Sequence, residues 1–223
     1  MIMLRQNKSL DDDWKSVTEL GAEFESLDVR VRQTELNKMY GWAMVADSEV
    51  SGLGLVRRNG WELEVYKVFL LKQKSNAAHT ELDDAAVAKL MMKLHKEKYN
   101  LADLRFWWHS HCDFDCFWSH TDHETARTLL KQNNNYMLSM VINKKQNYNI
   151  RLDLANPPIT IQNIPTEFQD LKLNLEKSKK EVQSNVEVQY ARPESGISAS
   201  VRITQSIMDR FTDFRHFGRW GNW

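Results

Sequence analysis

The residues best suited to metal chemistry lie in one short segment of the chain. His109 and His111 are two residues apart, and Asp122 follows eleven residues later. Side chains two apart on an extended strand leave the same face, so both imidazoles can reach one ion. Two nitrogens and one carboxylate oxygen suit a catalytic zinc site, since three protein ligands leave the fourth position open for water. The segment therefore predicts one Zn²⁺ per chain, bound by His109, His111 and Asp122.

A hydrolytic zinc site also requires a group that moves a proton. Zinc lowers the pKa of its bound water toward ~7, but cleavage of a peptide bond still needs a base that returns the proton to the leaving amine. Glu49, at the start of a glycine-bearing strand, is our candidate for this base. Glu62 and Glu64, on the adjoining predicted strand, remain alternatives.

Other polar residues close to the motif have simpler interpretations. His120 and His123 flank Asp122, but on a helix they point in other directions, so we expect them to support the ligands or to face solvent. Asp113 and Asp115 suggest calcium, yet the glycine and the distal glutamate of an EF-hand loop are missing. The segment thus contains one predicted metal site.

Composition gives expectations about compartment and partners. The 223 residues include 30 Lys plus Arg and 30 Asp plus Glu, which gives no reason to expect a nucleic-acid or membrane-surface binder. The start has no apolar signal region, and no stretch approaches the ~18 apolar residues of a membrane span. Cys112 and Cys116, the two cysteines, are poorly placed for a disulfide scaffold and fit a reducing compartment. We expect a soluble, cytoplasmic protein. A thiolate so close to the zinc could also compete as a ligand or respond to oxidation.

The candidate residues fall where predicted strands and helices meet. The apolar run Leu104–His109 predicts a central strand that brings the histidines to a sheet edge, and a helix is predicted from Ser119 to Lys131. Further strands are predicted at 27–32, 49–56, 61–71, 136–143, 148–154 and 159–164, with helices at 34–45 and from Thr80 to Tyr99 and a tight hairpin at Arg58-Asn59-Gly60. This alternation of elements predicts an α/β fold.

The complete motif resembles that of a known family. The spacing His109-x-His111-x7-Ser119-x2-Asp122, with Glu49 leading into Ser-Gly-Leu-Gly, is similar to the JAMM motif of JAB/MPN+ zinc metalloproteases of prokaryotic or phage type. The resemblance implies zinc ligands at His109, His111 and Asp122, an acid/base at Glu49, and a Ser119 hydroxyl that stabilises the tetrahedral intermediate as an oxyanion-type donor. It implies a single MPN (JAB)-like domain over residues 27–165, with a mixed central sheet flanked by helices. Members of the family often have proline after the second histidine, where this chain has Cys112.

The resemblance also implies an activity. Such a protein would hydrolyse a peptide or isopeptide bond of a protein substrate, at or near the tail of a ubiquitin-like protein, as a deubiquitinase does. The alternative is a catalytically silent scaffold of the same fold, for example a component of a virion or another complex. A zinc-dependent nucleobase deaminase is disfavoured, because the His-x-Glu and Pro-Cys-x-x-Cys elements of that chemistry are absent from the sequence.

Two segments lie outside the predicted domain. Residues 1–26 form an acidic N-terminal segment, and 166–223 form a C-terminal extension in which 166–188 read as a charged helix that is solvated or partner-dependent. The Phe211–Trp223 tail repeats an aromatic residue every three positions: Phe211, Phe214, Phe217, Trp220 and Trp223. Such a patch is costly when exposed, so we expect it to pack on the domain, on a second copy or on a protein partner. Stacking on nucleic acid is disfavoured for a neutral chain.

Overall fold

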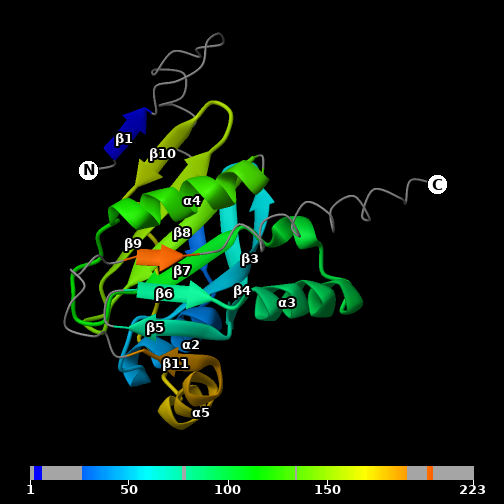
Figure 1. Ribbon diagram of the computed structural model, residues 1–223. Coiled ribbons are helices and arrows are strands. Elements are labelled where there is room, and N and C mark those ends of the chain that lie inside the picture. Colours follow the sequence, from blue (N-terminus) through cyan, green and yellow to red (C-terminus); the bar gives the residue numbers. More distant parts are fainter. Residues whose placement is uncertain (1–2, 7–26, 77–78, 134, 190–199, 203–223) are drawn as a thin grey trace.

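The structure is a computed structural model, which describes residues 3–6, 27–76, 79–133, 135–189 and 200–202. Its main sheet consists of β1 (Met3–Gln6), β2 (Asp28–Val31), β3 (Ser51–Asn59), β4 (Glu62–Leu70), β7 (Phe106–Ser110), β8 (Tyr136–Ile142), β9 (Tyr148–Leu154) and β10 (Ile159–Gln162) (Figure 1). The strands lie in the order β1-β10-β9-β8-β7-β3-β4-β2. The β7/β8 and β2/β4 pairs are parallel and the others are antiparallel, so the sheet is mixed.

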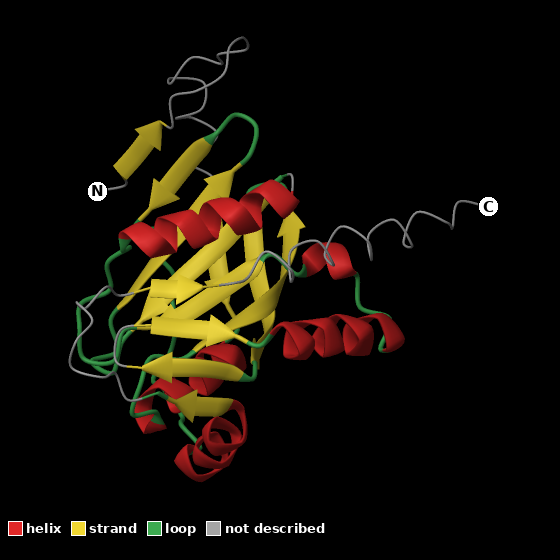
Figure 2. Ribbon diagram, viewed as in Figure 1, coloured by secondary structure: helices red, strands yellow, loops and turns green. Residues whose placement is uncertain are grey.

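Helices cover both faces of this curled sheet (Figure 2). Helices α2 (Gln33–Val45) and α5 (Leu175–Asn185) pack on one face, and α3 (Asp84–Lys96) and α4 (His120–Asn133) pack on the other. A short 3-10 helix, η1 (Leu101–Asp103), follows α3. The predictions of an α/β fold and of a mixed sheet flanked by helices are confirmed. Within the described residues, no helix is long and apolar enough to cross a lipid bilayer.

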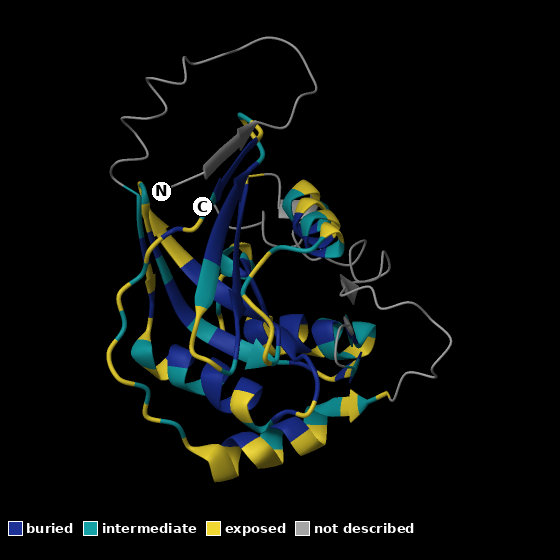
Figure 3. Cartoon of the chain, turned by 90° about the vertical axis from the view of Figure 1, so that its left-hand side faces the viewer, coloured by how far each residue is buried: buried dark blue, intermediate teal, exposed yellow. Residues whose placement is uncertain are grey.

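Alternate residues of β7 face two separate cores. Phe106 and Trp108 pack with α2, and Trp108 stacks on Trp42 with ring centroids 5.5 Å apart. Trp107 packs with residues of α3 and α4. Every residue of β7 is buried, as is most of the centre of the sheet (Figure 3). Because side chains alternate along a strand, His109 follows Trp107 to the face that α4 covers.

A second, smaller sheet lies beside the start of β3. It consists of β11 (Val186–Val188), β5 (Gln73–Asn76), β6 (His79–Leu82) and β12 (Ser200–Arg202), in that order. The side-chain amide of Gln73 joins this sheet to β3, because it accepts from the backbone N–H of Ser51 at 2.8 Å and donates to the carbonyl of Ser51 at 2.9 Å. Strand β12 lies between β6 and α4 (Figure 1).

The helix predicted from Thr80 is wrong at its start. Thr80 is a buried residue of β6, and α3 begins only at Asp84. The carboxylate of Asp83 accepts a hydrogen bond from the backbone N–H of Ala86 at 2.7 Å and so caps the helix. Both Thr80 and Asp83 are possible caps by residue type, and pairing of β6 with β5 decides between them.

The two terminal segments each contribute a described element. Met3–Gln6 pair with β10 as β1, a strand that the sequence analysis did not predict. In the C-terminal extension the predicted helix is confined to α5, where Trp42 Nε1 donates to Glu181 Oε2 at 2.6 Å and Val182 is buried against α2. The predicted aromatic tail, Phe211–Trp223, lies outside the described residues.

Gly52 of β3 lies where neighbouring strands approach closely. A Cβ atom there would lie 1.9 Å from the carbonyl oxygen of Phe69 and 2.8 Å from Trp108 Nε1. Gly60, in the predicted hairpin turn, has a φ of +60° and nothing within 4 Å of such an atom.

We expect Gly52→Ala to lower the free energy of unfolding by about 3 kcal/mol, and Gly60→Ala by about 1 kcal/mol. Urea titrations measure both values, and equal losses would contradict the close approach.

Candidate metal centre

His109, His111 and Asp122 come together as a group that could hold a metal ion, with their ligand atoms within 4.8 Å of one another. The two Nε2 atoms are 3.1 Å apart, and the carboxylate oxygens of Asp122 lie 3.5 Å from His109 Nε2 and 3.9 Å from His111 Nε2. Ligands at ~2.1 Å from a tetrahedral zinc ion lie about 3.4 Å from one another. The three donors therefore fit the spacing of such a site.

Strand pairing brings both histidines to this position. Strand β7 ends at Ser110, whose backbone N–H donates to the carbonyl of Val50 at 2.8 Å. The N–H of His111 donates to the carbonyl of Ile142 at 2.9 Å, so the chain stays extended past the end of β7. His109 and His111 therefore leave the same face of the sheet.

Ser119 caps α4 and orients the carboxylate of Asp122. Its Oγ accepts a hydrogen bond from the backbone N–H of Asp122 at 3.2 Å, and its own N–H donates to Asp122 Oδ2 at 2.8 Å. This reciprocal arrangement is a capping box. The Ser119 hydroxyl also donates to Asp122 Oδ2 at 2.6 Å, so the ligand carboxylate is held by both the side chain and the backbone of Ser119.

The surroundings of His111 and Asp122 favour the protonation states that bind a metal ion. The Asp115 carbonyl, which can only accept, lies 2.8 Å from His111 Nδ1, so this nitrogen carries the proton and Nε2 offers its lone pair. Burial, and then the charge of His109, lowers the pKa of His111 to about 4. Burial alone would raise the pKa of Asp122, but the charge of His109 and hydrogen bonds from His109 and Ser119 hold it at about 2. Near neutral pH, His111 is thus neutral and Asp122 is ionised.

Aromatic side chains enclose the imidazoles. Trp107 stacks on His109 with ring centroids 4.8 Å apart, and Trp118 meets His109 edge-on at 5.8 Å. Phe117 meets His111 edge-on at 4.9 Å and is half exposed. These ring contacts restrict the rotation of both imidazoles, which are themselves almost fully buried.

Glu49 lies on the segment that runs beside His111, just before β3 begins. The antiparallel β3/β7 register pairs Ser51 with His109, and its continuation aligns Glu49, two residues before Ser51, with His111, two residues after His109. Glu49 is 2% exposed. Burial, and then the charge of Asp122, raises its pKa to about 9. A buried carboxyl with a raised pKa, beside a group that could hold a metal ion, is a candidate for acid/base chemistry.

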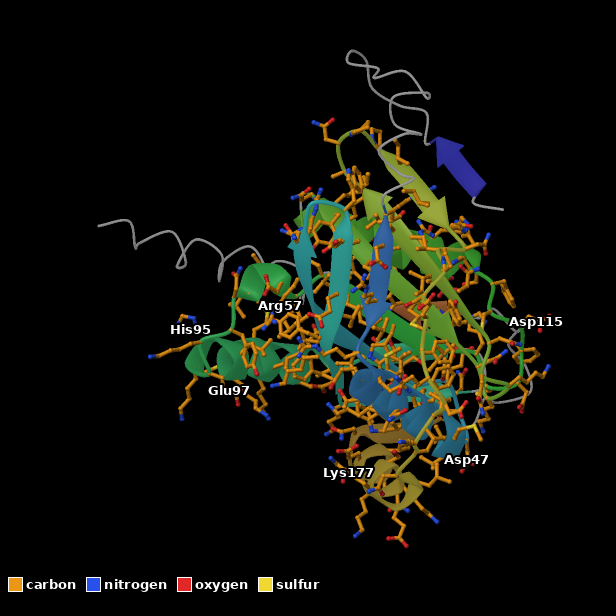
Figure 4. The ribbon with its side chains drawn as sticks, turned by 180° about the vertical axis from the view of Figure 1, so that it is seen from behind. Asp47, Arg57, His95, Glu97, Asp115 and Lys177 are labelled. Atoms are coloured by element: carbon orange, nitrogen blue, oxygen red, sulfur yellow. The ribbon has the colours of Figure 1, made fainter. Side chains whose placement is uncertain are left out.

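The alternative bases, Glu62 and Glu64, lie elsewhere. Strand β4 begins at Glu62, and Glu64 pairs with Arg57 toward the end of β3 that is remote from the histidines. Arg57 and Asp115 lie on opposite sides of the molecule (Figure 4). Of the three candidate glutamates, only Glu49 reaches the metal-binding group.

The other polar residues of the motif segment are not part of this group. His120 is exposed, and His123 forms a hydrogen bond with Arg151 instead. The side chains of Asp113 and Asp115 are exposed, and Figure 4 shows Asp115 at the edge of the molecule. Elsewhere in the described parts of the chain, no second group of three His, Cys, Asp or Glu side chains is placed to bind a metal.

The two cysteines are half-buried beside the site as protonated thiols. Burial is the main reason that the pKa of Cys112 rises to about 11 and that of Cys116 to about 12. The Cys116 thiol donates to the carbonyl of Asn147 at 3.3 Å. Because the thiolate is the metal-binding and readily oxidised form, this environment disfavours either cysteine as a ligand.

Two groups that support the site were not predicted. The Asp115 carbonyl that orients His111 is a main-chain group, so no residue type signals it. Gln73, which bonds both backbone groups of Ser51, lies on β5, a short polar strand without the apolar alternation that marks a strand in sequence.

Comparisons with known proteins add little to this geometry. No protein-family model matches the chain, and no match was found among curated proteins. Among solved structures, the chain is similar to the solution structure of protein DSY2949 from Desulfitobacterium hafniense, with a TM-score of 0.45 and 16% identity over 66% of this chain and 95% of that one. Similarity at this level carries no argument about function.

We expect the protein to bind one divalent metal ion through His109, His111 and Asp122. Zn²⁺ at 100 times its Kd should raise the free energy of unfolding by about 2.7 kcal/mol, because it binds only the native state. Asp122→Asn should lose most of this gain. His95→Ala is the control, since His95 is an exposed residue of α3 that points away from the domain (Figure 4). Urea titrations with and without zinc measure the gain, and equal gains in both variants would exclude this site.

The raised pKa of Glu49 predicts the pH dependence of stability in the metal-free protein. Between pH 4.5 and about 9 the native state keeps this proton and the unfolded state releases it, so stability falls as pH rises. Glu49→Gln should remove this loss and raise the free energy of unfolding at pH 8 by roughly 2–4 kcal/mol. Urea midpoints in chelator at pH 5 and pH 8 test this, with Glu62→Gln as the exposed control. A Glu49→Gln midpoint that follows wild type at both pH values would contradict it.

Proposed function

We propose that the protein is a zinc-dependent metallopeptidase of the JAMM type, which hydrolyses a peptide or isopeptide bond. One observation supports this proposal: Glu49 is buried close enough to the metal-binding group of His109, His111 and Asp122 for the charge of Asp122 to raise its pKa. The same residues make up the motif that resembles the JAB/MPN+ family. That resemblance also supports an MPN-like domain over residues 27–165.

The choice of zinc rests on the donor set. Two imidazoles and one carboxylate with roughly tetrahedral spacing suit Zn²⁺, and a three-ligand site leaves room for water. When bound, zinc would supply a Lewis acid that polarises the scissile carbonyl and acidifies the attacking water.

The chain's own residues would move the proton and hold the substrate oxygen. In its ionised form, which a cation at the ligands would favour over the protonated form of the metal-free protein, Glu49 would take a proton from the attacking water and return it to the leaving amine. The Ser119 hydroxyl lies at the ligands, where it would support the tetrahedral intermediate by turning its single proton from Asp122 to the substrate oxygen. Phe117 and Trp118 would border the entrance for an extended peptide.

The proposed substrate is a protein, cleaved at or near the tail of a ubiquitin-like protein. The family resemblance supports this class, and the enclosed metal-binding group is compatible with a narrow, extended chain. A catalytically silent scaffold has no need for a protonated carboxyl beside the ligands, whose burial opposes folding at neutral pH.

Glu49→Gln tests the chemistry directly. We expect kcat on isopeptide-linked ubiquitin-like conjugates to fall by roughly 10²–10⁴-fold, because the proton shuttle is lost while the ligands remain. Zinc content, measured by mass spectrometry, should equal that of wild type, and Glu62→Gln should be fully active. Wild-type protein that holds zinc but cleaves no conjugate or peptide would favour the scaffold alternative.

A further inference from the structure

A buried charge network lies under α4, next to the candidate metal centre. Arg151 of β9 is 1% exposed, and its Nε and Nη2 atoms donate to the two carboxylate oxygens of Asp153 at 2.7 Å each. Thr160 of β10 donates to the same carboxylate at 2.6 Å. Arg151 is therefore anchored to two strands of the main sheet in a fixed orientation.

The side of the Arg151 guanidinium that faces away from Asp153 contacts residues just before and just after the start of α4. Its Nη1 atom donates to His123 Nδ1, and its Cζ lies 5.7 Å from the ring centroid of Trp118. His123 directly follows Asp122, while Trp118 precedes the cap of the helix and contacts His109. The network thus links β9 to the segment that carries the carboxylate ligand.

Stability alone is a weak reason to bury such a pair. Removing two charges from water is costly, and well-packed apolar residues of similar volume are often as stable or more stable. A guanidinium offers something that apolar residues do not, because its planar set of donors fixes several partners in direction as well as distance. Here those partners are Asp153 on the sheet and His123 on α4.

We propose that Arg151 is a positioning residue, which fixes the first turn of α4 and thereby directs the carboxylate of Asp122 toward His109 and His111. The predicted effect of Arg151 on metal binding requires only that His109, His111 and Asp122 bind a metal ion. Any effect of Arg151 on catalysis rests on the proposed function as well. Arg151 is not itself one of the metal-binding residues, and it acts on them through His123 and Trp118.

Cobalt binding separates positioning from stability. In the Arg151→Met/Asp153→Met variant, which removes both buried charges, we expect the metal-free protein to unfold at the wild-type urea concentration. The Kd for Co²⁺, followed by its visible absorption, should rise about tenfold, as when groups that orient metal ligands are removed. Thr160→Val is the matched control, because it perturbs the network on the side away from α4 and should leave the Kd unchanged.

Arg151→Lys provides a second test if the double variant fails to fold. Lysine keeps the charge beside Asp153 but lacks the planar fork whose separate nitrogens hold Asp153 and His123 at once, so we expect near wild-type stability with weakened cobalt binding. A wild-type Kd and absorption spectrum in Arg151→Lys, or in a folded double variant, would overturn the proposal. Wild-type protein that binds cobalt but cleaves no substrate would count against the proposed function alone, because these measurements do not depend on turnover.

Discussion

The pairing of β3 with β7 is the constraint on which the site depends. This register sets Ser51 beside His109 and so aligns Glu49 with His111 on the face covered by α4. A slip of one residue in this register would turn the side chains of Glu49 and Ser51, or those of His109 and His111, to the opposite face of the sheet. Gly52 allows the close approach that the register requires, since no side chain fits between its neighbours. The candidate proton carrier and two of the candidate ligands thus come from one strand pair.

Burial then gives these aligned groups their chemistry. Removal from water raises the pKa of Glu49 and lowers that of His111, while hydrogen bonds and the charge of His109 keep Asp122 ionised. At neutral pH these shifts keep His111 neutral and Asp122 ionised, as in solution, whereas Glu49 holds a proton that it would release in water. A cation among the candidate ligands would offset the unfavourable negative charge of the buried carboxylates Asp122 and Glu49. Metal binding would therefore also stabilise the folded protein.

The sequence predicts the centre of the fold better than its edges. The apolar run before His109 and the spacing to Asp122 reflect local periodicity, so strand β7, helix α4 and the grouping of His109, His111 and Asp122 could be predicted. Glu49 could be named as a candidate from its place at the start of a glycine-bearing strand and from the motif resemblance, but its alignment with His111 depends on long-range strand pairing. Arg151 and Asp153 alternate with apolar residues as on a strand with one solvated face, yet α4 covers that face and the charges neutralise each other. Nothing local distinguishes a solvated polar face from a buried, paired one.

The indole walls around His109 also give the site an optical property. Trp107 stacks directly on this imidazole, and Trp118 lies at its edge on the loop that leads into α4. A paramagnetic ion bound at His109 would lie close enough to both indoles to quench their fluorescence. Movement of the α4 loop would change the emission of Trp118 far more than that of Trp107, which is held within a strand. Occupancy and loop movement can therefore be followed separately in the unlabelled protein through single tryptophan-to-phenylalanine replacements.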